Sequence, residues 1–250
     1  MISAIIITKN EEKSLKRSLR SLSWCDEVIV IDDDSTDDTV KIAEKLGAKV
    51  YKRSLDGDFS AQRNFGLQKA KNDWVLFIDA DEEVSPALWF EIMQHTNSPS
   101  DKYSGYFIKR QDVIWGRLLK YGETGNKKFL RLAKKNSGKW EGVVHEKWNV
   151  VGMTATLNNP LMHYPHVTIE NFLHEINLYT DIRAKELYDK KVRTSSFLII
   201  IYPLAKFIQN YFLKQGFRDG VPGLLLALMM SLHSFLVRSK LWFMLQKASK

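Results

Sequence analysis

Short apolar segments alternate with helical patterns along the first eighty residues, and this alternation limits the possible folds more than any other feature. The apolar segments are rich in β-branched and aromatic residues and cover residues 3–7, 27–31, 48–51 and 74–78. Between them, leucines and other apolar residues recur at helical spacing in residues 11–22, 40–46 and 60–70. Strands that alternate with helices predict an α/β fold with a largely parallel sheet and helices on its faces.

The pattern changes twice in the rest of the chain. Ser85 and Pro86 favour the start of another helix, and residues 103–160 predict short strands and loops that complete the sheet. Residues from Thr168 onward are predicted to be helical. We therefore expect a nucleotide-binding catalytic domain over residues 1–165 and a helical, membrane-associating region over residues 166–250.

The helical region contains two apolar stretches, residues 197–213 and 221–237. Both are shorter than the roughly 20 apolar residues of a spanning helix, which favours interfacial or hairpin-like attachment to a membrane. A tail packed on the sheet, a contact between copies of the chain and true spanning helices are the alternatives.

Charge and cysteine content restrict the partners. The chain of 250 residues has a formal charge of +8, and residues 170–250 hold 12 Lys/Arg against 6 Asp/Glu. Because this excess lies beside the apolar stretches, it favours an anionic membrane surface over nucleic acid. The single cysteine, Cys25, excludes an internal disulfide, and no signal peptide is apparent at Met1, so we expect the cytoplasmic side of the membrane.

Polar residues follow three of the predicted strands, where the ligands of parallel sheets bind. The three segments are TKNEE at residues 8–12, DDDST at 32–36 and DADEE at 79–83. So many carboxylates would repel one another unless a cation or hydrogen-bond donors lie among them, and oxygen ligands suit Mg²⁺ or Mn²⁺. Taken alone, residues 32–38 could instead be a helix N-cap, and Glu11 and Glu12 could be ordinary first-turn acids of a helix. The Asp-x-Asp pattern at residues 79–81 is by itself a weak motif that occurs by chance in many proteins.

The order and spacing of these segments resemble glycosyltransferase family 2, an inverting family with the GT-A fold. The resemblance is carried by ITKNEE, VIVIDDDSTDDT, FSAQRNFGLQKAKNDWVLFIDADEE and VVHEKW, and it covers about the first 165 residues. The later segment GFRDGVPGLLLALMMSLHSFLVRSKLW is similar to the membrane-associated end of a subgroup that includes lipopolysaccharide core glucosyltransferases.

The resemblance implies a nucleotide-sugar donor, with UDP-glucose the suggestion of the subgroup. By position, it implies that Thr8, Asn10 and Glu11 contact the nucleotide and that Asp33, beside Asp32, binds the uracil edge. Asp34 departs from the family, which usually has Gly there, and this replacement bears on the turn and on which aspartate faces the base.

For the diphosphate, the resemblance implies a basic contact from Arg63, a place for Asp79 near the ribose or metal shell, and Asp81 as the ligand of Mg²⁺ or Mn²⁺. His163 and His166 lack the spacing of a zinc site, although one of them could complete the shell of the donor metal. The basic residues between Lys127 and Lys135, Arg131 among them, are compatible with a solvated face, with acceptor phosphates or with lipid headgroups.

Inversion needs one general base to take the proton of the acceptor hydroxyl. The resemblance implies Glu146 for this role, with His145 beside it, and the alternative is an ordinary surface glutamate near Lys147. Glu82, Glu83 and Glu141 are further candidates.

Three functions are compatible with these residues. The first is an inverting, metal-dependent hexosyltransferase that acts on a lipopolysaccharide core or other lipid-linked saccharide at the cytoplasmic face of the inner membrane. The second is a polyprenyl-phosphate glycosyltransferase, and the third is a nucleotide-binding protein without catalysis. The presence of Asp79, Asp81 and Glu146 argues against the third. A homo-oligomer formed through the C-terminal helices is also compatible with the pattern.

Overall fold

The computed structural model describes residues 1–98, 100–124, 127–142, 146–165 and 168–248. Its contacts divide the chain into two units: residues 1–110 with 126–163, and residues 111–125 with 164–250. Residues 111–125, which fall within the first of the two regions expected from the sequence, thus lie in the helical unit.

The first unit contains the predicted parallel strands, β1 (Ile2–Thr8), β2 (Glu27–Asp32), β3 (Lys49–Lys52) and β4 (Trp74–Asp79). The sheet continues through antiparallel β8 (Lys128–Lys134) and β6 (Gly105–Ile114) to β12 (Leu161–His163) and β5 (Glu82–Val84), in the order β3-β2-β1-β4-β8-β6-β12-β5. The short strands β7 (Arg117–Leu118) and β11 (Thr154–Thr156) pair with β6, while β9 (Gly138–Glu141) and β10 (Lys147–Val150) form a separate antiparallel pair. The fold is of the mixed α/β type that the sequence predicts.

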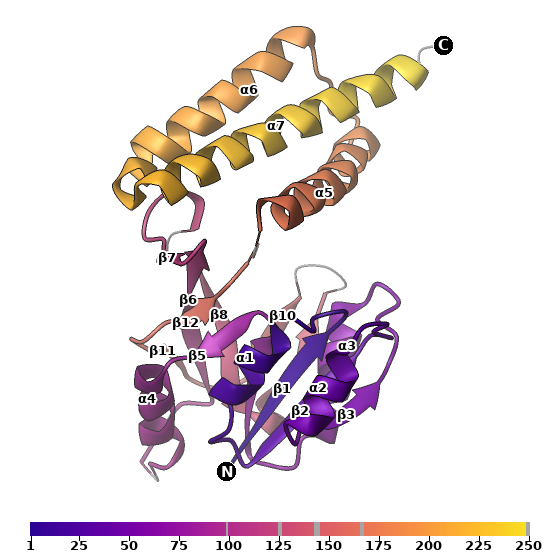
Figure 1. Ribbon diagram of the computed structural model, residues 1–250. Coiled ribbons are helices and arrows are strands. Elements are labelled where there is room, and N and C mark those ends of the chain that lie inside the picture. Colours follow the sequence, from indigo (N-terminus) through magenta and orange to yellow (C-terminus); the bar gives the residue numbers. More distant parts are fainter. Residues whose placement is uncertain (99, 125–126, 143–145, 166–167, 249–250) are drawn as a thin grey trace. The chain divides into compact units, whose positions relative to one another are not determined.

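Helices cover both faces of this sheet (Figure 1). Side chains of α1 (Leu15–Ser21), α2 (Thr39–Lys45) and α4 (Pro86–Thr96) join one apolar cluster with Ile6 and Ile78. On the other face, α3 (Phe59–Lys69) and the pair β9–β10 pack against Ile5 and Phe77. Because successive side chains of a strand point to opposite faces, a strand covered on both sides must be apolar on both, as residues 4–7 of β1 are.

The helix predicted over residues 11–22 begins later, at Leu15. The chain at Asn10 has a positive φ of 54°, and the Glu11 N–H donates to Thr39 Oγ1 at 2.7 Å instead of entering a helix. The loop after β1 is thereby kept free of helix at the edge where ligands bind.

The second unit consists mainly of α5 (Ile169–Asp189), α6 (Ser196–Ile208) and α7 (Val221–Ala248), joined by a π-helical turn (Gln209–Leu213) and a 3₁₀ turn (Gly216–Asp219). Buried side chains of α5 and α7, among them Phe172, Ile176, Leu226 and Leu241, pack between these helices. Asp219 accepts hydrogen bonds from the backbone N–H groups of Lys120 and Tyr121, which fixes the loop of residues 119–121 in this unit.

One of the two apolar segments is longer than the sequence suggested. α7 continues through Arg238 and Lys240 to a length of 28 residues, so the expectation that the second stretch is too short for a spanning helix is wrong. The other segment, Ser196–Leu213, has 18 residues and nearly the bounds expected from the sequence. Both Ser196–Leu213 and Val221–Lys247 are long and apolar enough to cross a membrane by length and composition alone.

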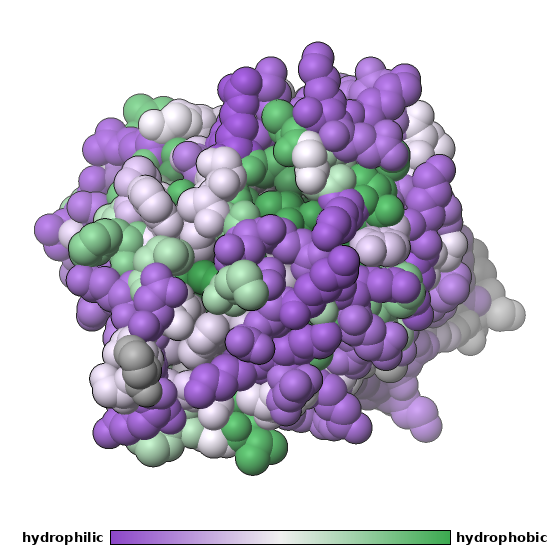
Figure 2. Space-filling model, turned by 90° about the horizontal axis from the view of Figure 1, so that it is seen from below, coloured by the Kyte–Doolittle hydropathy of each residue, from purple (hydrophilic) through white to green (hydrophobic). Residues whose placement is uncertain are grey.

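Most of the large apolar side chains that remain exposed belong to the second unit, including Phe197, Ile200 and Leu204 of α6. By contrast, the face of the molecule in Figure 2 is mostly hydrophilic, with apolar side chains gathered in separate small patches.

Candidate functional site

The loops after β1 and β2 are linked by hydrogen bonds at the carboxyl edge of the sheet. The Asn10 N–H donates to Ser35 Oγ at 2.9 Å, and the Thr36 N–H donates to Asn10 Oδ1 at 2.8 Å. Asn10 thus holds together the two loops to which the nucleotide contacts are assigned by sequence.

Asp33 lies in this edge with its carboxylate already held in place. Its Oδ1 accepts from the Leu55 N–H at 2.8 Å, and its Oδ2 pairs with Lys9 Nζ at 2.9 Å. Burial opposes ionisation of Asp33, but these donors outweigh it and lower the pKa of the carboxyl below its ordinary value. Asp33 is therefore an anionic acceptor with a fixed orientation.

Asp34 occupies the position where the family usually has Gly. Its φ of 51° is in the left-handed region, which Gly enters without strain and which Asp tolerates better than most residues. Ser54 Oγ donates to Asp34 Oδ2 and holds the side chain in place. The turn that a Gly would permit is thus formed with Asp.

Several buried polar atoms at this edge have no hydrogen-bond partner within the described part of the chain: Thr8 Oγ1, Asp32 Oδ1 and Arg63 Nη1. Unpaired buried polar atoms are costly and call for an explanation such as a ligand. Here they include both a guanidinium donor and a carboxylate acceptor, which fits a ligand with anionic and N–H groups, such as a nucleotide.

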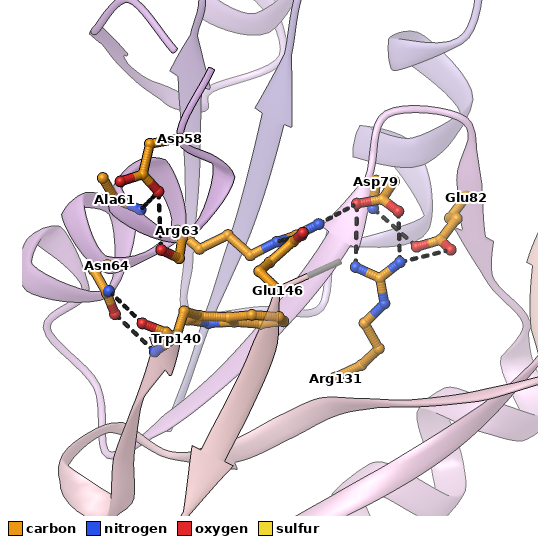
Figure 3. Close-up of polar contacts among 10 residues, drawn as sticks. Asp58, Ala61, Arg63, Asn64, Asp79, Glu82, Arg131, Trp140 and Glu146 are labelled. Atoms are coloured by element: carbon orange, nitrogen blue, oxygen red, sulfur yellow. Dashed lines mark hydrogen bonds and ion pairs between the residues drawn. The ribbon is translucent and has the colours of Figure 1, made fainter. Parts of the chain in front are cut away.

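Arg63 connects two of the predicted site residues that lie far apart in the sequence (Figure 3). It projects from α3, whose first turn is capped by Asp58 through the Ala61 N–H at 2.9 Å. Its Nε donates to Glu146 Oε1 at 2.8 Å, and its Nη2 lies 3.3 Å from Asp79 Oδ1. The guanidinium also lies over the Trp140 ring, 4.6 Å from its centroid, which restricts its movement.

Arg131 is a site residue that the sequence analysis did not identify. It is 5% exposed, and its guanidinium donates to both oxygens of Asp79 and to Glu82 Oε1 (Figure 3). Of the alternatives given for the basic residues 127–135, a solvated face is wrong at this position, because Arg131 lies in the buried middle of strand β8. A single charge within the apolar run FLRLA was the available signal, since a buried arginine needs a partner.

Arg131 contacts both Asp79 and Glu82, but the pKa values of these two carboxyl groups shift in opposite directions. Burial opposes ionisation of Asp79, but Arg131 and Arg63 together hold the pKa of that carboxyl well below its usual range. Burial, reinforced by the neighbouring charge of Asp79, raises the pKa of Glu82 to about 7. The Asp79 side chain is 33% exposed, and its oxygens are bound by two arginines. Asp79 is therefore suited to hold Arg63 and Arg131 in position and is not suited to accept a proton.

Asp81 and His163 meet at the same edge. His163 Nε2 lies 3.1 Å from Asp81 Oδ2, because β12, which ends at His163, pairs with β5 directly after the turn that contains Asp81. One carboxylate and one imidazole fit a divalent cation that takes its remaining ligands from a diphosphate and water. Within the described ranges, no group of three His, Cys, Asp or Glu residues forms a complete metal site.

The remaining sequence candidates have other positions. Glu141 is half exposed on β9, where it pairs with Lys139 at 3.4 Å and accepts from Asn149. Glu83 is partly exposed and lines a separate groove, whereas Glu82 is buried, as alternation along β5 requires. His145 and His166 lie outside the residues that the structure describes.

Comparison with known proteins assigns the class to which this fold and this edge belong. The sequence profile of glycosyl transferase family 2 matches residues 3–152, so the chain belongs to that family.

Two curated relatives match over nearly the whole chain. An uncharacterised glycosyltransferase of Rickettsia conorii is 36% identical over 252 residues, covering 96% of this chain and 89% of the relative. The lipopolysaccharide core biosynthesis glycosyltransferase LpsC of Rhizobium meliloti is 25% identical, with 96% and 92% covered. Among solved structures, residues 1–349 of Staphylococcus aureus TarS match with a TM-score of 0.48 and 18% identity, covering 98% of this chain and 91% of that one.

Proposed function

We propose that this protein is an inverting, metal-dependent hexosyltransferase that transfers a sugar from a UDP-sugar to a saccharide of the lipopolysaccharide core or to another lipid-linked saccharide. Membership of family 2 and the similarity to LpsC support the reaction class and the acceptor class. Residues 1–165 would form the catalytic domain, and residues 166–250 would associate with the cytoplasmic face of the inner membrane.

The observation that carries the proposal is the double contact of Arg63. One guanidinium binds Glu146, the predicted base, and Asp79, the predicted donor residue. The predicted donor and acceptor functions are thereby adjacent, as transfer from one molecule to another requires.

In the proposed reaction, the nucleotide binds the linked loops after β1 and β2, with the base edge at Asp33 and with Thr8, Asn10 and Glu11 beside it. Arg63 directs a donor N–H toward the diphosphate, and Arg131 keeps Asp79 in place. Glu146 Oε2 accepts the proton of the acceptor hydroxyl while its Oε1 stays on Arg63. The hydroxyl oxygen attacks the anomeric carbon as its bond to the diphosphate oxygen breaks, which inverts the configuration.

A divalent cation, Mg²⁺ or Mn²⁺, would be held by Asp81 and His163 and would neutralise the charge that develops on the leaving diphosphate. Asp79 suits a supporting role better than direct ligation, because both of its oxygens are bound by arginine.

The test is transfer measured by mass spectrometry with a panel of UDP-sugars and a deacylated core saccharide. We expect Glu146→Gln to lower kcat by about 10²- to 10⁴-fold, the usual contribution of a general base, with donor binding nearly unchanged. Glu141→Gln, at the end of β9 and outside the contacts of Arg63, is the matched control and should retain activity. EDTA should abolish transfer in the wild type. Substantial turnover by Glu146→Gln would remove it as the base, and full activity in EDTA would remove the metal.

A polyprenyl-phosphate acceptor is the second candidate, and one observation favours it. Both Ser196–Leu213 and Val221–Lys247 are long and apolar enough to span a membrane, as expected of an enzyme whose acceptor is embedded in one. Adding undecaprenyl phosphate to the same assay separates the two: transfer to the lipid phosphate but not to the saccharide would replace the first acceptor by the second.

A further inference from the structure

A groove of ≈ 670 Å³ lies in the first unit, lined by α1, the turns at its two ends, and the segment from β5 into α4. Lys13, Lys16, Arg17 and Arg20 line it, with Glu83 as the carboxylate among the lining residues. None of these residues belongs to the donor site described above.

The four basic side chains recur at intervals of three and four residues, so they share one face of α1 and the turn before it. The opposite face, with Leu15 and Leu19, is buried in the core. Like charges at this spacing repel one another and destabilise a helix, and an anion bound among them would remove that repulsion. The groove is thus electrostatically suited to a phosphate or carboxylate.

Two tryptophans form an aromatic part of the lining. The Trp24 ring is fixed by a hydrogen bond from its Nε1 to Ser21 O at 2.7 Å. Trp89 lies beside it, with the ring centroids 6.3 Å apart and the planes tilted by 31°, and it is 42% exposed. Indole faces are electron-rich and attract the polarised C–H groups on one face of a pyranose ring.

We propose that this groove binds a phosphorylated saccharide, with the phosphate on the basic face of α1 and the sugar ring on Trp89. A concave site with convergent cations and an aromatic wall is suited to a discrete ligand rather than to a flat lipid surface. Arginine and lysine both form strong charge-assisted hydrogen bonds to phosphate.

Both walls of the groove are formed by segments that directly follow loops of the proposed donor site in the chain. Lys13 follows the Asn10–Glu11 loop by two residues, and Glu83 follows Asp81 by two. The groove is therefore placed to hold a phosphorylated part of the acceptor away from the reacting hydroxyl. This role, unlike the binding itself, rests on the proposed function.

The test is binding of glucose 6-phosphate to the full chain, followed by the indole Nε1–H signals in NMR, with glucose and inorganic phosphate as separate ligands. We expect glucose 6-phosphate to bind more tightly than either and to shift the Trp89 signal, which Trp89→Phe identifies by its loss. Lys16→Gln/Arg20→Gln should weaken binding by about tenfold or more, because two charge-assisted contacts are lost. Lys45→Gln, an exposed lysine of α2 outside the groove, is the matched control and should bind as the wild type does.

Unchanged binding in the double variant would overturn the proposal. So would equal affinity for glucose 6-phosphate and inorganic phosphate, since it would leave a basic patch without a sugar site. Loss of binding to phosphatidylglycerol vesicles in the double variant, with no effect on glucose 6-phosphate, would assign the groove to lipid headgroups instead. Because no donor is present, a failure of sugar transfer does not affect this result, and a failure here leaves the transferase assay standing.

Discussion

At the scale of single residues, the site depends on how two arginines share three carboxylates. Arg63 binds Glu146 and Asp79, while Arg131 binds Asp79 and Glu82. Asp79 receives both guanidinium groups, so it is the carboxylate that stays ionised, and Glu82 is left with the raised pKa. Glu82 is therefore the one whose charge changes near neutral pH.

This difference predicts a pH dependence of folding stability. In the unfolded chain Glu82 ionises near its ordinary pKa of 4.5, whereas in the folded protein it does so at about 7. Between these values the folded state holds the additional proton, so the free energy of unfolding should fall as pH rises, by up to about 1.4 kcal/mol per pH unit. Above pH 7 both states are ionised and the contribution of Glu82 levels off.

Urea denaturation at pH 5, 6, 7 and 8 measures this slope. Glu82→Gln cannot ionise, so its stability should decline less between pH 5 and 7 than that of the wild type. Glu83→Gln, next in the chain and outside the arginine network, is the control and should keep the wild-type slope. Parallel curves for the wild type and Glu82→Gln would show that Glu82 has an ordinary pKa in the folded state.

The sequence was informative about residues that end strands and less so about residues within them. Asp33, Asp79 and Asp81 follow apolar runs, and a parallel sheet must bring such ends to one edge. Arg131 enters the site from an antiparallel strand in the segment without clear alternation, and its register against β4 depends on long-range pairing. His163 likewise reaches Asp81 only through the pairing of β12 with β5.

At the scale of elements, α3 is the helix on which the site most depends. Its packing on the sheet requires Gly66, where an added Cβ would lie 2.7 Å from Ile5 Cγ2. Ile5 is fully buried in β1, so its methyl group cannot move aside easily. Arg63 lies almost one turn before Gly66 on this helix, and its position therefore follows that of α3.

The contact predicts that Gly66→Ala destabilises the protein, although Ala is the better helix former by about 1 kcal/mol. Overpacking costs about 1–3 kcal/mol, so the expected net loss is about 1 kcal/mol for Ala and larger for Gly66→Val. Gln68→Ala, at an exposed position of the same helix, should be neutral or slightly stabilising. The midpoints of denaturation measure the stabilities of these variants relative to the wild type. A Gly66→Ala variant more stable than the wild type would mean that α3 can move away from β1.

The elements themselves were largely predictable through α4, because each buries one apolar face and has clear end signals. Ser85 caps α4 through the Leu88 N–H, and Pro86 occupies its first position, as the sequence indicates. The apolar stretch predicted from the sequence ends at residue 237, before Arg238, whereas α7 extends to Ala248. Lys240 instead pairs with Asp181 and donates to Asn177 of α5, so the helix continues past its charged residues.

At the scale of the whole molecule, the two units differ in what they expose. Basic and apolar side chains occur together in residues 164–250, a combination that suits an interface between anionic headgroups and lipid chains. On α6, Ile200, Ile201 and Leu204 are exposed and none of the helix residues is fully buried. Such a surface is unfavourable in water unless it contacts lipid or another protein.

Membrane association through α6 predicts that Ile200→Gln/Leu204→Gln weakens binding to vesicles that contain phosphatidylglycerol. Burial of an apolar side chain contributes about 1.5–3 kcal/mol, so losing two should reduce the partition coefficient by at least about tenfold in a flotation assay. Transfer to a deacylated, soluble acceptor should be retained, because neither residue lies in the first unit, which contains the proposed site. Leu46→Gln, an exposed leucine after α2, is the control and should float as the wild type does.

Oligomerisation is the competing use of the same surface, and the double variant distinguishes the two. If α6 contacts a second copy of the chain, the substitutions should change the mass measured by light scattering in detergent-free buffer and leave vesicle binding unaltered. If α6 contacts lipid, vesicle binding should fall and return with added anionic lipid only in part, since the basic residues are intact but the apolar area is lost. A changed mass with unaltered vesicle binding would show that α6 does not mediate membrane association, because one surface cannot be covered by both partners at once.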